Sequence, residues 1–122
     1  VPGTLIVRLD APIYYANALT VAEWIKDQVA NTHPSPHVVV MDAAGQDSLD
    51  ITSAEALKSL VVDLKEKGID YYVAEVHAPV REFGQRSGLL EVISEDHIFP
   101  TVDAAVRFIE MSAGSEKDNL DV

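Results

Sequence analysis

The stretch from Val38 to Leu60 constrains the fold most, because a short apolar run, a polar loop and an amphipathic segment follow one another there. Residues 38–42 are mostly β-branched and apolar, are too few for a helix and precede Gly45, so they predict a buried strand. The second half predicts a helix that starts near Ser53. Its apolar face follows the i, i+3, i+4, i+7 spacing of a helix: Leu57, Leu60, Val61 and Leu64.

Three short polar side chains, those of Asp50, Thr52 and Ser53, lie where this helix is expected to begin. Thr52 and Glu55 have the spacing of a capping box, in which the threonine hydroxyl accepts from an early helical N–H and the glutamate reaches back. The positive end of the helix dipole favours negative charge at such a corner. The corner from Asp50 to Ser53 is therefore the first candidate site.

The other elements follow from turn residues and hydrophobic periodicity. Residues 4–9 and 13–15, on either side of the turn at residues 10–12, predict a hairpin at one edge of a sheet. A helix that starts at Asn17 or Thr20 must end before the two prolines of residues 31–36. Beyond residue 68 we expect a strand at 70–76, a helix at 80–87, a turn or short strand at 89–93, an edge strand at 98–99 and a last helix capped by Thr101.

After the hairpin, strands and helices alternate along the chain. This order predicts an α/β fold with a mixed, largely parallel sheet and with helices mainly on one face. A chain of 122 residues is expected to form one domain, here residues 1–111. Residues 112–122 are polar and unpatterned, which predicts a disordered tail.

The charge of the chain excludes several classes of partner. Nine Lys and Arg residues stand against 20 Asp and Glu residues, and the formal net charge of -11 would repel nucleic acid and anionic membrane surfaces. No apolar run approaches the roughly 18–20 residues that span a bilayer, so we expect no membrane insertion by this segment. The chain begins with Val1 rather than methionine, which indicates either an excised piece of a longer protein or removal of the initiator.

The sequence carries no familiar catalytic or metal motif. The histidines at positions 33, 37, 77 and 97 lack the spacing of metal ligands, and cysteine is absent. No Gly-x-Ser-x-Gly elbow and no glycine-rich phosphate loop occurs. Asp42, Asp47 and Asp50 could form a carboxylate cluster for a divalent ion, but turn and cap roles are the stronger interpretation. The paired tyrosines at positions 14–15 and 71–72 are expected to pack on strands with one ring of each pair inward and the other outward.

Four motifs in order resemble the STAS domain, the fold shared by sulfate transporters and anti-sigma factor antagonists. They cover about residues 2–111, and within the family they are most similar to the cytoplasmic domain of SulP anion transporters. The motifs are Pro2-Gly3 with Arg8–Ala18, Leu49–Leu57, Gly68–Ala74 and Asp96–Val106.

The resemblance implies a regulatory and interaction module rather than an enzyme. It implies a C-terminal position on the cytoplasmic side of the inner membrane, with the transmembrane domain of the same transporter and a regulatory protein as partners. In the antagonists a partner kinase phosphorylates a serine at the corner, and Thr52 matches that position. Ile51 and Ser53 depart from the antagonist pattern of a small hydroxyl residue and a glycine, which favours the transporter branch.

Two alternatives stay open. The first is a free-standing signalling protein like the anti-sigma factor antagonists. The second, less favoured, is a small acid hydrolase that uses Asp42 or Asp50. Members of the family also bind nucleotides, but no residue here identifies a nucleotide site, so the sequence assigns no cofactor. The transported anion is equally open, because this domain does not line the transport path.

Overall fold

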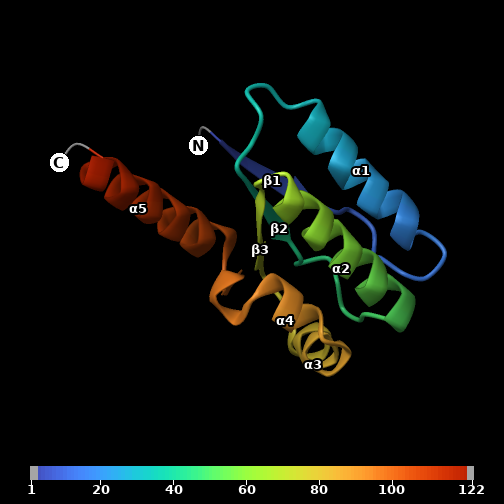
Figure 1. Cartoon of the computed structure of the whole chain (residues 1–122). Helices are drawn as coiled ribbons and strands as arrows, with labels where there is room; N and C mark the ends of the chain where they lie inside the picture. Colours follow the sequence, from blue (N-terminus) through green and yellow to red (C-terminus); the bar gives the residue numbers. More distant parts are fainter. Residues whose placement is uncertain (1–2, 121–122) are drawn as a thin grey trace.

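A parallel four-stranded sheet forms the centre of the computed structural model, which describes residues 3–120 and the side chains of residues 3–113 (Figure 1). The strands lie in the order β1-β2-β3-β4, and each pairs in parallel with its neighbour. They are β1 (Thr4–Arg8), β2 (Val38–Asp42), β3 (Asp70–Ala74) and β4 (Ile98–Phe99). The predicted α/β fold with a largely parallel sheet is confirmed.

Helices cover the two faces of the sheet unequally, as Figure 1 shows. One face carries α1 (Ala18–Ala30), α2 (Ile51–Glu66), α3 (Ala78–Ser87) and α4 (Leu89–Ile93). After a short 3-10 turn, η1 (Glu95–His97), and β4, helix α5 (Val102–Leu120) packs on the other face. The expectation that helices lie mainly on one face is confirmed.

Both tyrosines of the second pair are buried, so the expectation that one of them faces outward is wrong. Alternation along β3 does turn them to opposite faces, but helices cover both faces. Tyr71 lies on the side of α1 and α2, where its hydroxyl donates to the sulfur of Met41 at 2.8 Å. Tyr72 lies on the side of α5 and stacks on His97, with 4.0 Å between ring centroids.

The predicted hairpin at residues 4–15 is also wrong, because residues 13–15 form no strand. Side chains take up the backbone donors that a neighbouring strand would have bound. The N–H groups of residues 13, 14 and 15 donate to Gln46 Oε1 at 2.8 Å, to Asn17 Oδ1 at 2.8 Å and to Asp50 Oδ2 at 2.9 Å. The segment therefore becomes a loop that is tied to the start of α2.

Other elements depart from expectation only locally. Residues 89–93 form the helix α4 rather than a turn or strand, because Gly88, in the left-handed conformation at φ 83°, permits a bend directly after α3. Strand β3 ends at Ala74, because Glu75 has a positive φ of 63° and the chain turns away from the sheet there. The expected cap of the last helix is confirmed, because the N–H of Ala104 donates to Thr101 Oγ1 at 3.0 Å.

The backbone of α5 continues as helix to Leu120, so residues 112–120 of the expected tail are helical in this structure. Residues 121–122 lie outside the described residues. The domain boundary at residue 111 stays a prediction.

Candidate functional site

Asp50 caps helix α2 and joins the corner to the loop before α1. Its backbone is extended, at φ -105° and ψ 171°, and its Oδ1 accepts from the N–H of Ser53 at 2.7 Å. Its other oxygen, Oδ2, accepts from the N–H of Tyr15 at 2.9 Å. One carboxylate thus satisfies a free donor at the helix start and fixes a loop 35 residues earlier in the chain.

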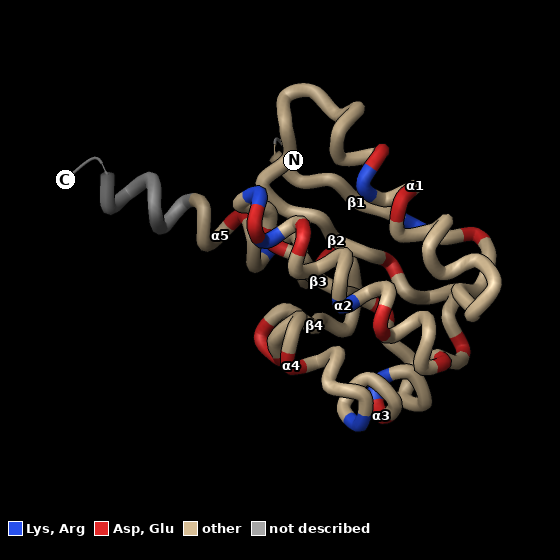
Figure 2. The backbone as a smooth tube through the Cα atoms, turned by 45° about the vertical axis from the view of Figure 1, so that its right-hand side comes forward, with Lys and Arg blue, Asp and Glu red and all other residues tan. Residues whose placement is uncertain are grey.

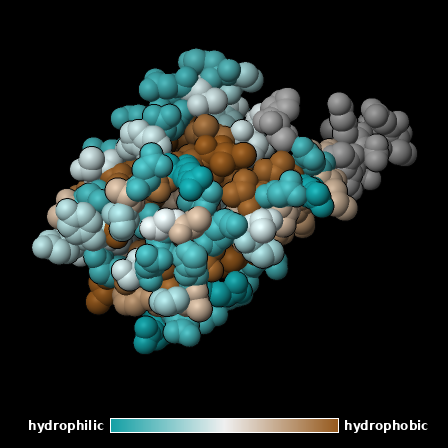
Figure 3. All heavy atoms as spheres, turned by 180° about the vertical axis from the view of Figure 1, so that it is seen from behind, coloured by the Kyte–Doolittle hydropathy of each residue, from teal (hydrophilic) through white to brown (hydrophobic). Residues whose placement is uncertain are grey.

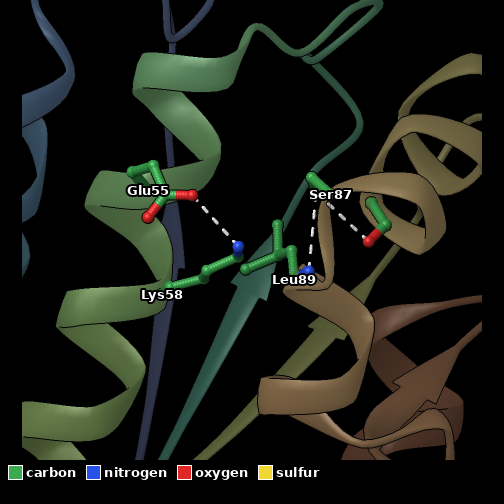
Figure 4. A network of polar contacts seen from close by, with 5 residues as sticks. Glu55, Lys58, Ser87 and Leu89 are labelled. Atoms are coloured by element: carbon green, nitrogen blue, oxygen red, sulfur yellow. Dashed lines mark hydrogen bonds and ion pairs between the residues drawn. The ribbon is translucent and has the colours of Figure 1, made fainter.

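The predicted capping box at Thr52 and Glu55 is therefore wrong in its register. The helix begins at Ile51, so Thr52 already lies inside the first turn and Asp50 takes the cap position. Glu55 does not reach back, because its carboxylate pairs with the ammonium group of Lys58 at 3.1 Å (Figure 4). Aspartate, like serine and threonine, is a favoured cap residue, and it also meets the positive end of the dipole as an anion.

The pKa of the Asp50 carboxyl lies below its usual value, mainly because the N–H of Ser53 donates to it. The N–H of Tyr15 acts in the same direction. Partial loss of hydration opposes this effect but does not cancel it. The corner therefore carries a fixed negative charge at neutral pH.

The three predicted site residues have different surroundings. Thr52 is exposed, so a kinase or a partner protein can reach its hydroxyl. Ser53, by contrast, is 0% exposed and is packed under the first turn of α2, which requires a small side chain at this position. Asp50 is occupied by its two backbone donors. Of the three, only Thr52 is free for contact.

Sequence patterns missed a set of apolar side chains around this corner. We call Tyr14, Tyr15, Leu19 and Ile51 the corner patch; Leu19 is 72% exposed and Ile51 69% exposed. The two tyrosine rings meet edge to face, with 5.7 Å between their centroids. Exposed apolar groups that gather in one place are typical of interaction surfaces. The position of Ile51 between two polar residues hid it in the sequence, because it lies outside the buried face of α2.

The aspartates that could have formed a metal site do not converge. Within residues 3–113, no group of three or more potential ligands lies close enough to hold a metal ion. Asp42 accepts instead from the N–H of Ala44 at 3.0 Å, as a turn residue does. His77 and His97 each donate a ring N–H to a backbone carbonyl, those of Ala44 and Tyr71 respectively. These contacts support turn and packing roles.

The sequence profile of the STAS domain family matches residues 1–105, most of the chain. This chain belongs to the STAS domain family. Its STAS sequence is 35% identical over 114 residues to a probable sulfate transporter of Mycobacterium tuberculosis, a match that covers 88% of the chain. It is thus homologous to the SulP sulfate transporters, although it spans only 19% of that relative.

Among the solved structures that share this fold are a transporter and a candidate antagonist. A murine Solute Carrier 26 family anion transporter matches with a TM-score of 0.84 and 23% identity, over 91% of this chain and 18% of the transporter. A candidate anti-sigma factor antagonist of Thermotoga maritima matches with a TM-score of 0.71 and 15% identity, over 90% of both chains. The fold is therefore shared by part of an anion transporter and by a candidate anti-sigma factor antagonist.

None of the helices in the described part of the STAS chain is both long and apolar enough to cross a membrane. The acidic residues are spread over the helices and loops rather than gathered on one element, as Figure 2 shows.

Proposed function

We propose that this STAS domain is the non-catalytic cytoplasmic regulatory domain of a SulP-type transporter of sulfate or a related anion. The observation that carries the proposal is the 35% identity to a sulfate transporter over 88% of the chain. The domain acts through protein contacts at the corner from Asp50 to Ser53. It takes part in no chemical step, and it lies on the cytoplasmic side of the membrane that holds the transport domain.

The residues of the corner have two different roles: some hold the corner rigid, and others contact the partner. Asp50 holds the loop before α1 against the start of α2 through hydrogen bonds of 2.9 Å and 2.7 Å. Ser53 packs beneath this junction. Thr52 and Ile51 are exposed above it and make the contact. A rigid base lowers the entropy cost of binding, because few groups must become ordered when a partner docks.

The transmembrane domain of the same transporter is the first partner of this corner, and a regulatory protein is the second. Cytoplasmic loops of membrane proteins are rich in Lys and Arg. A domain with a net charge of -11 is attracted to such loops and repelled by nucleic acid.

Phosphorylation of Thr52 would regulate this contact. A phosphate adds a charge of about -1.5 to -2 at neutral pH, and the start of a helix favours it. The Asp50 carboxylate opposes the added charge, so the change is felt mainly by a docked partner. The domain itself is expected to stay folded.

The test is Thr52→Glu in the full-length transporter, with anion uptake and assembly measured in cells. We expect uptake to change while the amount of folded protein does not. Ser35→Glu is the matched control, because Ser35 is an exposed hydroxyl residue in the loop before β2, at the opposite end of that strand. If Thr52→Glu behaves like Ser35→Glu, the corner has no regulatory role.

A free-standing signalling role is the second candidate, because the match to the candidate antagonist covers 90% of both chains. The coding sequence upstream of Val1 separates the two. A transporter would show several apolar stretches of about 20 residues there, whereas an antagonist would show none.

A further inference from the structure

A groove of about 440 Å³ runs between α1 and α2, beginning at the corner patch. On α1 it is lined by Leu19, Ala22, Glu23 and Lys26, which have the i, i+3, i+4, i+7 spacing of one helix face. Its other wall is formed by residues of α2 between Ile51 and Leu60. A groove between two neighbouring helices is a common binding site for a third, amphipathic helix.

Small side chains form the floor of the groove, and exposed apolar side chains form its rim. Ala22 and Ala56 are buried at the floor, where their short side chains let another backbone approach. Leu19 and Ile51 stand on opposite walls at the mouth, and each is more than two-thirds exposed, at 72% and 69%. Both side chains are therefore free to anchor a bulky apolar residue of a partner.

Three charged residues line the groove, Glu23, Lys26 and Glu55, and two of them are held in ion pairs. Lys26 is neutralised by Asp63, with 2.6 Å between Nζ and Oδ2, and Lys58 is neutralised by Glu55 at 3.1 Å. Glu23 lines the groove and makes no ion pair within the part of the chain that the structure describes. The net charge of -11 acts in the same direction over the whole chain.

We propose that the groove between α1 and α2 binds a basic amphipathic helix of a protein partner. The apolar face of that helix packs on Leu19 and Ile51, and its Lys or Arg side chains point toward Glu23. The inference rests on the proposed function for its biological role, and it gives phosphorylation a direction. Thr52 lines the same groove, so a phosphate there strengthens the attraction to a basic helix.

The experiment uses the 122-residue chain and a synthetic fluorescent peptide with Leu at i, i+3, i+4 and i+7 and Lys at the other positions. A second peptide carries Glu in place of Lys, and a third has the composition of the first in scrambled order. We expect the first peptide alone to bind in anisotropy titrations, more weakly as salt rises. Amide shifts in NMR spectra are expected to change along α1 and α2.

Two substitutions locate the binding surface. Leu19→Ala and Ile51→Ala are each expected to weaken binding about tenfold, since each removes an apolar anchor without adding charge. Met111→Ala is the matched control, because Met111 is 74% exposed on α5, on the other side of the sheet, and is expected to leave binding unchanged. Thr52→Glu is expected to tighten binding by about two- to fivefold at low salt. Thermal unfolding verifies that each variant is folded.

Three results would overturn the proposal: equal binding of the Lys and Glu peptides, equal binding of the scrambled peptide, or equal loss of binding in Met111→Ala and Ile51→Ala. A transporter whose uptake responds to Thr52→Glu, with no peptide binding by the chain, would refute the basic helix but leave the regulatory corner standing. Peptide binding in the groove without any change of uptake would support the groove and refute the proposed function.

Discussion

The two faces of the sheet differ in how completely they are covered, and the candidate site lies on the better covered side. Under α1 and α2, Ile25 and Leu60 are fully buried. On the other face α5 packs on β2, β3 and β4, which leaves Ile6 of β1 50% exposed. Figure 3 shows apolar residues at the surface on the side of the molecule toward α5.

Apolar side chains are therefore exposed for different reasons on the two faces of the sheet. Ile6 is exposed because α5 packs on the other three strands, β2, β3 and β4, so Ile6 lies at the edge of the core on that face. Ile51 and Leu19 are exposed above a closed core, on helices that already bury their inner faces. Substitutions in the corner patch are therefore expected to change binding, whereas substitutions beneath the helices change stability.

The largest expected effect is on the closed face. Leu60→Ala should lower the free energy of unfolding by about 2–5 kcal/mol, because it truncates a side chain that is 0% exposed. Ile109→Ala on the half-buried side of α5 should cost less than half as much, since solvent already reaches that side chain. Urea unfolding of both variants measures the difference. Equal costs would show that the two faces are packed equally well.

The two tyrosines of β3 should contribute differently to the loss of stability at alkaline pH. Burial raises the pKa of the Tyr71 hydroxyl far above its usual value of 10.0, and burial with the nearby charge of Asp70 raises that of Tyr72. A raised pKa in the folded state means that stability is full below pH 10.0 and is lost as pH rises above it. The slope is about 1.4 kcal/mol per pH unit for each tyrosine kept neutral.

Urea unfolding at a series of alkaline pH values tests this. Tyr71→Phe is expected to remove most of the loss of stability above pH 10.0, and Tyr72→Phe a smaller part, because Tyr71 lies on the closed face. The same loss in Tyr71→Phe and in the unmodified chain would place the pH dependence elsewhere.

The smallest expected effect is at the cap. Asp50→Ala should cost about 0.5–2 kcal/mol of stability, because the N–H groups of Ser53 and Tyr15 lose their acceptor. Asp47→Ala is the control, since Asp47 is exposed in the preceding loop, and it should cost nothing measurable. Thermal unfolding of both variants provides the comparison. If Asp47→Ala is as unstable as Asp50→Ala, the hydrogen bonds of Asp50 do not account for the loss of stability.

The cap also predicts the response to acid. The pKa of Asp50 is lowered in the folded state, so its contribution is full above its usual value of 3.8 and is lost as pH falls below it. Asp50→Asn keeps an acceptor but cannot titrate, so it should show less loss of stability in acid than the unmodified chain. Parallel acid unfolding curves for the two would contradict this assignment.

Local patterns predicted the elements whose own residues carry a clear signal, even where their pairing partners are distant in sequence. The strand at Val38–Asp42, the edge strand at Ile98–Phe99 and the cap at Thr101 were all predicted, because the signal for each is contained in a few neighbouring residues. The loop at residues 13–15 was not, since its β-rich composition matches a strand. Its donors are bound by Gln46 and Asp50, which lie 33 and 35 residues further along the chain.

The corner from Asp50 to Ser53 stays a predicted site, and the structure differs from the sequence prediction in the structural roles of its residues. The sequence located the corner and the exposed hydroxyl of Thr52, but it assigned the cap to Thr52 rather than to Asp50 and did not distinguish the buried Ser53. The groove could not be predicted, because Leu19 and Ile51 become neighbours only when α1 packs on α2.

By itself, the sequence determined the alternation of strands and helices, the acidic charge and the resemblance to STAS domains. These properties depend on periodicity, composition and motifs, which are local. Only the tertiary structure decided which side chain caps α2, which face of the sheet is closed and where apolar groups gather outside the core. Each of these depends on contacts between segments that are far apart in the chain. The free energies of such contacts cannot be inferred from local sequence patterns.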